Sequence, residues 1–267
     1  MKWSEEADRA IKKVPFFVRK KGKRKVEAHA QQKSKTSVEF SDVNELKKKF
    51  LSKGGMKKEI KGYEVTTCFG SSGCPNTANS GTGLAKDIEK IIEKEDILGF
   101  LKETVEGDLK FHHEFRAAIS DCPNACSRPQ IVDIGIIGSV LPGISDEECI
   151  LCNACVEACK EKAITLDYEN ELPLIDYDQC LMCAKCISAC PTGIIVQKEK
   201  GFRVMLGGRL GRHPRLAMEV PGLHTHGEVL QIVKKCLEFY KENSKKGERF
   251  SHILSSLDQI VDKKYNN

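Results

Sequence analysis

The 267-residue sequence has no apolar run long enough to cross a membrane, and its amino terminus has neither an apolar signal core nor a cleavage site. We therefore expect the protein to stay in the cytoplasm. Apolar residues make up 40% of the chain and charged residues 30%, as in soluble globular proteins of one or two domains. A reducing compartment does not favour a disulfide framework for the thirteen cysteines, so metal binding is the better interpretation.

The net charge of +5 is unevenly distributed along the chain. Residues 1–62 contain 19 Lys and Arg against 8 Asp and Glu, a net charge of +11, whereas the remaining residues sum to −6. Residues 19–25 form the densest basic run. Such a run is compatible with a nucleic-acid arm, a docking surface for an acidic redox partner, or a solvated helix face. We do not expect a nucleic-acid partner.

Hydrophobic periodicity predicts an α+β fold with a small helical segment at the amino terminus. Residues 1–52 are basic, free of cysteine and helix-prone, with a helix that begins near Val43 and is capped by Ser41. Gly54, Gly55 and Gly62 mark a linker after this segment.

Residues 63–141 are predicted to be mixed α/β, residues 142–198 change character abruptly, and residues 199–267 return to α/β. The run Ile131–Ile137 is nearly all apolar and β-branched, which favours a strand buried on both faces. A lone cysteine, Cys236, falls on an apolar helical stripe and is expected to be a buried hydrophobe. Further strands are expected at 63–67, 115–119 and 202–206, and helices at 83–95 and 228–240.

Two runs of four cysteines with the spacing C-x2-C-x2-C-x3-C lie within residues 142–198. The first three cysteines of such a run lie on one loop, which places three thiolates around one [4Fe–4S] cubane. The fourth cysteine of each run ligates the other cluster. Zinc sites favour two C-x2-C pairs instead. The spacing therefore predicts one cluster on Cys149, Cys152, Cys155 and Cys190, and a second on Cys180, Cys183, Cys186 and Cys159.

This central segment resembles a bacterial two-cluster ferredoxin over nearly its whole length. Short strands are expected at 163–166 and 173–176, as such a module needs. Lys160 stands where the first run would usually have a proline, although all eight ligands are present. The resemblance implies that the segment relays single electrons and does no bond chemistry itself.

Four further cysteines lie upstream, as Cys68-x5-Cys74 and Cys122-x3-Cys126, at the ends of predicted strands. Neither pair has the C-x2-C spacing of a zinc knuckle, although a zinc site remains an alternative. With residues 121–138 around the second pair, the pattern resembles the nitrite and sulfite reductase haemoprotein family. The resemblance implies a third [4Fe–4S] cluster on these four cysteines, with Cys126 also touching the iron of a siroheme.

The same resemblance extends over about residues 63–267, with the ferredoxin segment inserted as in the anaerobic and dissimilatory sulfite reductases. It implies a small inorganic oxyanion as substrate, either sulfite or nitrite, and electrons supplied by a donor protein or subunit. Residues 207–214 resemble the family's cofactor-side loop, so Gly207 and Gly208 are expected to approach the siroheme.

Basic side chains near these motifs are candidates for stabilising charge on the substrate oxygens and delivering protons. Some of them could instead bind the carboxylates of the siroheme rim, and each has an alternative as an ordinary surface charge. The pair His112-His113 is less favoured, because adjacent strand residues point to opposite faces. The candidates are Arg116, Arg128, Arg209, Arg212 and His213.

Residues 3–51 resemble the small carboxy-terminal domain of light-independent protochlorophyllide reductase subunits, chiefly through the run Pro15–Arg19. In that family the domain packs over a tetrapyrrole, so here it could close the siroheme pocket. In the family that this chain resembles, full-length reductases carry a half-domain before their first cysteine pair, and we expect no counterpart of it here. We therefore expect an oligomer, or a second subunit that completes the catalytic site.

Three functions remain compatible with the sequence. The first is a siroheme-dependent sulfite or nitrite reductase, or its catalytic subunit, that takes electrons through the two ferredoxin clusters. The second is a non-catalytic electron-transfer subunit with three clusters and no haem. The third is a tetrapyrrole-handling reductase that acts on another substrate.

Overall fold

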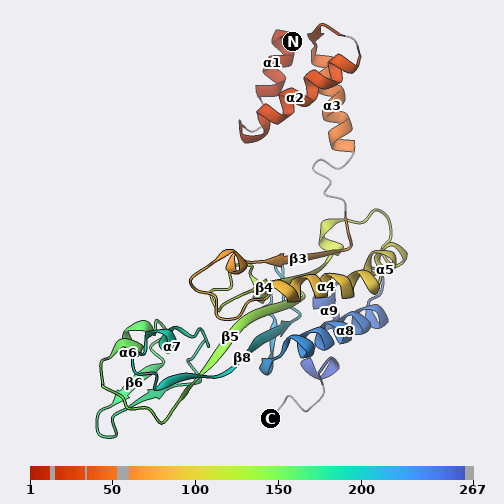
Figure 1. Cartoon of the computed structure of the whole chain (residues 1–267). Helices are drawn as coiled ribbons and strands as arrows, with labels where there is room; N and C mark the ends of the chain where they lie inside the picture. Colours follow the sequence, from red (N-terminus) through yellow and green to blue (C-terminus); the bar gives the residue numbers. More distant parts are fainter. Residues whose placement is uncertain (13–15, 34, 53–59, 262–267) are drawn as a thin grey trace. The chain divides into compact units, whose positions relative to one another are not determined.

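A computed structural model describes residues 1–12, 16–33, 35–52 and 60–261. It divides into two compact units, residues 1–59 and 60–267 (Figure 1). Pro15, in the run that carries the amino-terminal resemblance, and the linker glycines Gly54 and Gly55 lie outside the described residues. Among the helices that the structure describes, none is long and apolar enough to cross a membrane.

The amino-terminal unit packs three helices around a small apolar core. The core consists of Ala7, Val26, Ala30, Val38 and Val43, with Trp3 packed against it. The helices are α1 (Glu5–Lys12), α2 (Phe16–Gln32) and α3 (Phe40–Ser52), and the short strands β1 (Lys2–Trp3) and β2 (Ser37–Val38) pair in parallel.

The basic run at residues 19–25 lies on α2, where most of its side chains are exposed. Arg19 and Lys23 are half-buried, and Lys23 pairs with Asp8 at 3.0 Å and lies 5.0 Å from the centroid of the Trp3 ring. The predicted capping role of Ser41 was wrong. Ser41 lies inside α3, and it is Asp42 whose carboxylate accepts a hydrogen bond from the backbone N–H of Glu39, at 3.0 Å.

The second unit is built on a five-stranded sheet in the order β3-β4-β5-β8-β9. Strands β3, β4 and β5 are parallel, whereas β5 pairs with β8 and β8 with β9 in antiparallel fashion. The α+β prediction is confirmed. The strands are β3 (Tyr63–Thr67), β4 (Phe115–Ser120), β5 (Ile134–Ile144), β8 (Ile195–Leu206) and β9 (Met218–His224).

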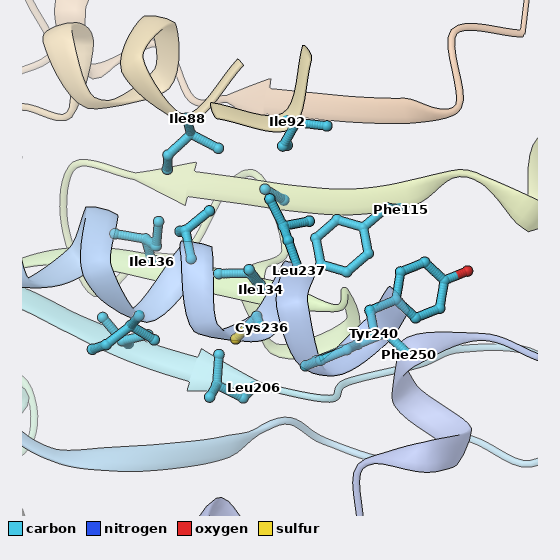
Figure 2. Close-up of a cluster of buried hydrophobic side chains, with 14 of the residues drawn as sticks. Ile88, Ile92, Phe115, Ile134, Ile136, Leu206, Cys236, Leu237, Tyr240 and Phe250 are labelled. Carbon is cyan, nitrogen blue, oxygen red and sulfur yellow. The ribbon is translucent and has the colours of Figure 1, made fainter. Parts of the chain in front are cut away.

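The main apolar core lies between one face of this sheet and the helices packed on it. The helices are α4 (Thr82–Lys94), α5 (Ile97–Thr104), α8 (His226–Asn243) and α9 (Phe250–Ile253). Figure 2 shows Leu237 and Tyr240 of α8 packed toward Phe115 of β4 and Ile134 of β5. Cys236 is fully buried in this core, so the prediction that it is a small hydrophobe is confirmed.

The strand predicted at residues 131–137 begins three residues later than expected, at Ile134, because Pro129–Ile131 form a 3-10 turn. Its predicted burial on both faces is confirmed for residues 134–140. Helix α5 and strand β9 were not predicted. His112-His113 also differs from expectation, since Phe111–His113 form a 3-10 turn rather than a strand.

Strands β5 and β8 are long, and their far ends extend beyond the sheet to carry the cysteine-rich segment (Figure 1). This segment repeats one pattern, in which a cysteine loop is followed by a short helix. Its elements are α6 (Ala154–Ala158), β6 (Ile164–Asp167), β7 (Leu172–Ile175) and α7 (Lys185–Ala189), with β6 and β7 paired antiparallel.

Candidate functional site

The third cysteine set lies at the carboxyl ends of β3 and β4. Cys68 directly follows β3, and Cys122 lies two residues after β4, so the parallel pairing of these strands brings the two loops together. Burial raises the pKa of the Cys122 thiol, and the nearby thiols of Cys126, Cys68 and Cys74 raise it further. The four cysteines therefore converge in space, with Cys122 buried and Cys126 exposed.

Asp121 joins the loops that carry these cysteines. Its backbone N–H donates to Sγ of Cys68 at 3.2 Å, and its carboxylate accepts from the N–H of Gly81 at 3.0 Å. Its carbonyl oxygen accepts from the N–H groups of Ala78 and Asn79, at 2.8 and 3.1 Å. Sequence motifs did not single out Asp121, because these partners are 40 or more residues away along the chain.

We expect Asp121→Ala to loosen the third cysteine set, because the buried N–H of Gly81 would lose its acceptor, at a cost of about 1–3 kcal/mol. The measurement is the rate at which an iron chelator removes iron from the anaerobic protein. Asp121→Asn keeps an oxygen at that position and should restore the slow rate. Equal rates for the wild type and the alanine variant would show that Asp121 does not position the cysteines.

The segment after Cys122 packs against β4 and β5 before it enters β5. The Ser120 and Ser127 hydroxyls hydrogen-bond at 2.7 Å, which ties the segment to β4. Gly135 faces Pro129 so closely that a Cβ there would lie 2.0 Å from the Pro129 carbonyl oxygen. Glycine at this position of β5 thus allows the cysteine-bearing segment to lie directly on the sheet.

The two ferredoxin loops share an unusual backbone. In each loop the residue before the second cysteine and the residue after it are left-handed although neither is glycine. Left-handed non-glycine residues are strained, and they persist where the surroundings require them. Successive N–H groups in such turns form concave anion sites of the kind that hold iron–sulfur clusters. The residues are Leu151 and Asn153 in the first loop and Met182 and Ala184 in the second.

Each ferredoxin loop borders a pocket that also contains one cysteine from the other run. Cys190 lies with the first-loop cysteines in one pocket, called the first pocket, and Cys159 lies with the second-loop cysteines in another, called the second pocket. Among the residues that the structure describes, no group of His, Cys, Asp and Glu is spaced to hold a single metal ion. The first pocket contains Cys149, Cys152, Cys155 and Cys190, and the second contains Cys159, Cys180, Cys183 and Cys186.

The second pocket also reaches the third cysteine set, because Cys122 and Asn124 contribute to its wall. A parallel bridge joins Val140 of β5 to Cys183, and Nζ of Lys185 donates to the carbonyl of Pro75 at 3.3 Å. The walls of the first pocket contain only residues 149–194. The second pocket thus lies between the other two cysteine groups.

The environment of the thiols differs along the segment. Burial raises the pKa of Cys186 to about 11 and also raises the pKa of Cys155 and Cys180. Burial also acts on Cys190, but hydrogen bonds from the backbone of Ile195 and from Thr192 outweigh it and lower the pKa of that thiol. Iron binding to the buried thiols would therefore release protons.

The five basic candidates differ in how exposed their side chains are. Arg128, Arg212 and His213 are exposed, whereas Arg116 and Arg209 are partly buried and bind backbone carbonyls. A guanidinium nitrogen of Arg116 donates to the Phe111 carbonyl at 3.0 Å. Arg209 donates to the carbonyls of His213 and Ser251, at 2.8 and 2.6 Å.

The glycine-rich loop packs against the turn that precedes β5. The Gly207 N–H donates to the Asp133 carbonyl at 2.8 Å, and a Cβ on Gly208 would lie 2.4 Å from the Gln130 carbonyl oxygen. Arg215, which the sequence analysis did not select, donates to the carbonyls of Gly207 and Leu254, at 2.7 and 3.1 Å. Both glycines thus have close backbone contacts within the chain.

The fold and the three cysteine groups are those of an iron–sulfur protein. Residues 61–258 match the family described as the nitrite and sulphite reductase 4Fe-4S domain, and the chain belongs to this family. Residues 3–47 match the family described as the proto-chlorophyllide reductase 57 kD subunit. The resemblances to the nitrite and sulfite reductase family and to the protochlorophyllide reductase subunits are confirmed.

Curated relatives are similar to much of this chain. The coenzyme F420-dependent sulfite reductase of Methanocaldococcus jannaschii is 33% identical over 211 residues, which cover 78% of this chain and 31% of the relative. One subunit of the anaerobic sulfite reductase of Salmonella typhimurium is 31% identical over 186 residues, which cover 68% of this chain and 50% of that subunit. The chain thus spans 31% to 50% of the length of these relatives.

The crystal structure of dissimilatory sulfite reductase I superposes with a TM-score of 0.47 at 14% identity. The superposition covers 75% of this chain and 50% of that one.

Proposed function

We propose that this chain is the siroheme-dependent catalytic subunit of a sulfite or nitrite reductase. The observation that carries the proposal is the third cysteine set, in which three thiols are at least partly buried and Cys126 is exposed. An exposed fourth thiol can serve both a cluster held within the loops and a large cofactor outside them. The curated relatives described above, which are sulfite reductases or their subunits, support this proposal.

In this proposal each of the three cysteine groups would hold one [4Fe–4S] cluster, and the exposed Cys126 would also touch a siroheme. The first and second pockets each bring four thiols together, and Cys68, Cys74, Cys122 and Cys126 form the third group. When bound, the clusters supply single electrons and the siroheme iron supplies a site for a small oxyanion.

The chain's own residues would perform the supporting chemistry. Arg128, Arg212 and His213 are exposed, so they are available to neutralise the substrate's oxygens and to donate protons. Arg209 and Arg215 hold the glycine-rich loop against the carboxy-terminal helix α9 through carbonyl contacts. We therefore assign the exposed residues to catalysis and siroheme binding, and Arg209 and Arg215 to positioning of the loop.

We also propose that a second subunit, or a second copy of the chain, covers this site. Phe69, directly after Cys68, is 84% exposed, and Leu216, beside the glycine-rich loop, is 70% exposed. Large apolar side chains at this level of exposure beside a reaction site favour an interface.

The experiment is turnover by the anaerobically purified full chain with reduced methyl viologen as electron donor. We expect sulfite or nitrite to oxidise the viologen, and Cys126→Ala to abolish that oxidation. Cys236→Ala is the matched control, because it removes a thiol that lies in the apolar core. If neither oxyanion oxidises the viologen, the proposed function is wrong.

A further inference from the structure

The rim of the first pocket combines open access with an exposed apolar side chain. Cys152 is exposed, and Ile150, which borders the same pocket, is 63% exposed. On the β6–β7 hairpin, Leu172 and Leu174 face away from this pocket, since Pro173 between them is buried and lines it. Ile150 therefore supplies the apolar contact beside the pocket.

The negative charge of the second unit is concentrated in the cysteine-rich segment, residues 142–198. Residues 142–198 contain ten Asp and Glu against four Lys, a net charge of −6, whereas the rest of residues 63–267 has twenty of each sign. Asp146, Glu147 and Glu148 directly precede Cys149 and are all exposed.

The lysines of this segment are distributed unequally between the two pockets. Lys160 and Lys185 line the second pocket, whereas no basic residue lines the first. Because Asp146, Glu147 and Glu148 lead directly into Cys149, which lines the first pocket, an acidic surface adjoins that pocket. The first pocket is also the one that shares no wall with the third cysteine set.

We propose that the rim of the first pocket, made of Asp146, Glu147, Glu148 and Ile150, is a docking surface for a one-electron protein with a basic contact face around an apolar centre. The inference rests on the proposed function, because that function requires electrons to reach the chain from outside. Opposite charges steer and orient the encounter, and the apolar side chain of Ile150 gives the complex its buried contact.

The test is the affinity of the anaerobically purified full chain for cytochrome c, a basic one-electron haem protein, measured by calorimetry at low and high salt. Neutralising the rim with Asp146→Asn, Glu147→Gln and Glu148→Gln is expected to weaken binding roughly ten-fold at low salt and to flatten its salt dependence. The matched control is a triple variant that removes the same number of negative charges elsewhere, in α5 and the residues after it. Its substitutions are Glu103→Gln, Glu106→Gln and Asp108→Asn. It should leave the affinity within roughly two-fold of the wild type.

Ile150→Ser should weaken binding at both salt concentrations, because the apolar contribution is not screened. Equal effects of the two triple variants, or no effect of the rim variant, would overturn the proposed surface. None of the changed residues belongs to a proposed cluster ligand set, so each variant should keep its full iron content. Loss of the proposed function, seen as absent siroheme or absent turnover, would leave this binding result unchanged.

Discussion

Cys122→Ala is expected to remove about four of about twelve iron atoms per chain and to leave the two ferredoxin clusters in place. Cys122 is the buried member of the third cysteine set, and its thiol lies near those of Cys68, Cys74 and Cys126. An alanine side chain cannot ligate iron. The third cluster would therefore lack one of its four ligands at a buried position and should not be retained. Iron and sulfide analysis of the anaerobic protein, with electron paramagnetic resonance after reduction, measures the loss.

Cys236→Ala is the control for this result. It removes another buried thiol, but Cys236 lies in the core of the sheet and helices (Figure 2), so iron content should stay at the wild-type value. Full iron content in the Cys122 variant would contradict the third cluster. Loss of nearly all iron would contradict the independence of the ferredoxin segment.

Gly135→Ala is expected to have a comparable effect without touching a ligand. The added Cβ would lie 2.0 Å from the Pro129 carbonyl oxygen, and a backbone atom cannot move aside as a flexible side chain can. Overpacking of this kind costs about 1–3 kcal/mol, and here the strain falls on the segment that carries Cys122 and Cys126. We therefore expect loss of third-cluster iron and a lower thermal midpoint, measured by iron analysis and by calorimetry.

Gly227→Ala is the matched control, because a Cβ at Gly227 meets no atom within 4 Å and alanine favours the helix α8. It should keep its iron and its thermal midpoint. If Gly135→Ala behaves in the same way, the close contact between β5 and the cysteine-bearing segment does not hold the third set in place.

Local spacing explains what the sequence could predict. The strand at residues 63–67 was predicted with the observed bounds, because its alternation and flanking glycine are local signals. The grouping of Cys190 with the first loop and Cys159 with the second follows from a spacing rule that needs no fold. In the structure each of these cysteines lies in the pocket of the other run.

Contacts between distant parts of the chain explain what the sequence could not predict. Asp121 is important because of its contacts with Gly81 and Cys68, which lie 40 and 53 residues away along the chain. Arg209 matched a family loop, yet its guanidinium binds the Ser251 carbonyl, 42 residues away. The capping prediction for Ser41 failed for a local reason. The carboxylate of Asp42, one residue later, accepts the hydrogen bond from the Glu39 N–H.

The most direct test of the central claim is the visible absorption spectrum of the anaerobically purified full chain. The account predicts siroheme bands superimposed on the broad absorption of the iron–sulfur clusters, and loss of those bands in Cys126→Ala. A featureless brown iron–sulfur spectrum in the wild-type protein would contradict the assignment of Cys126 as the link to a siroheme.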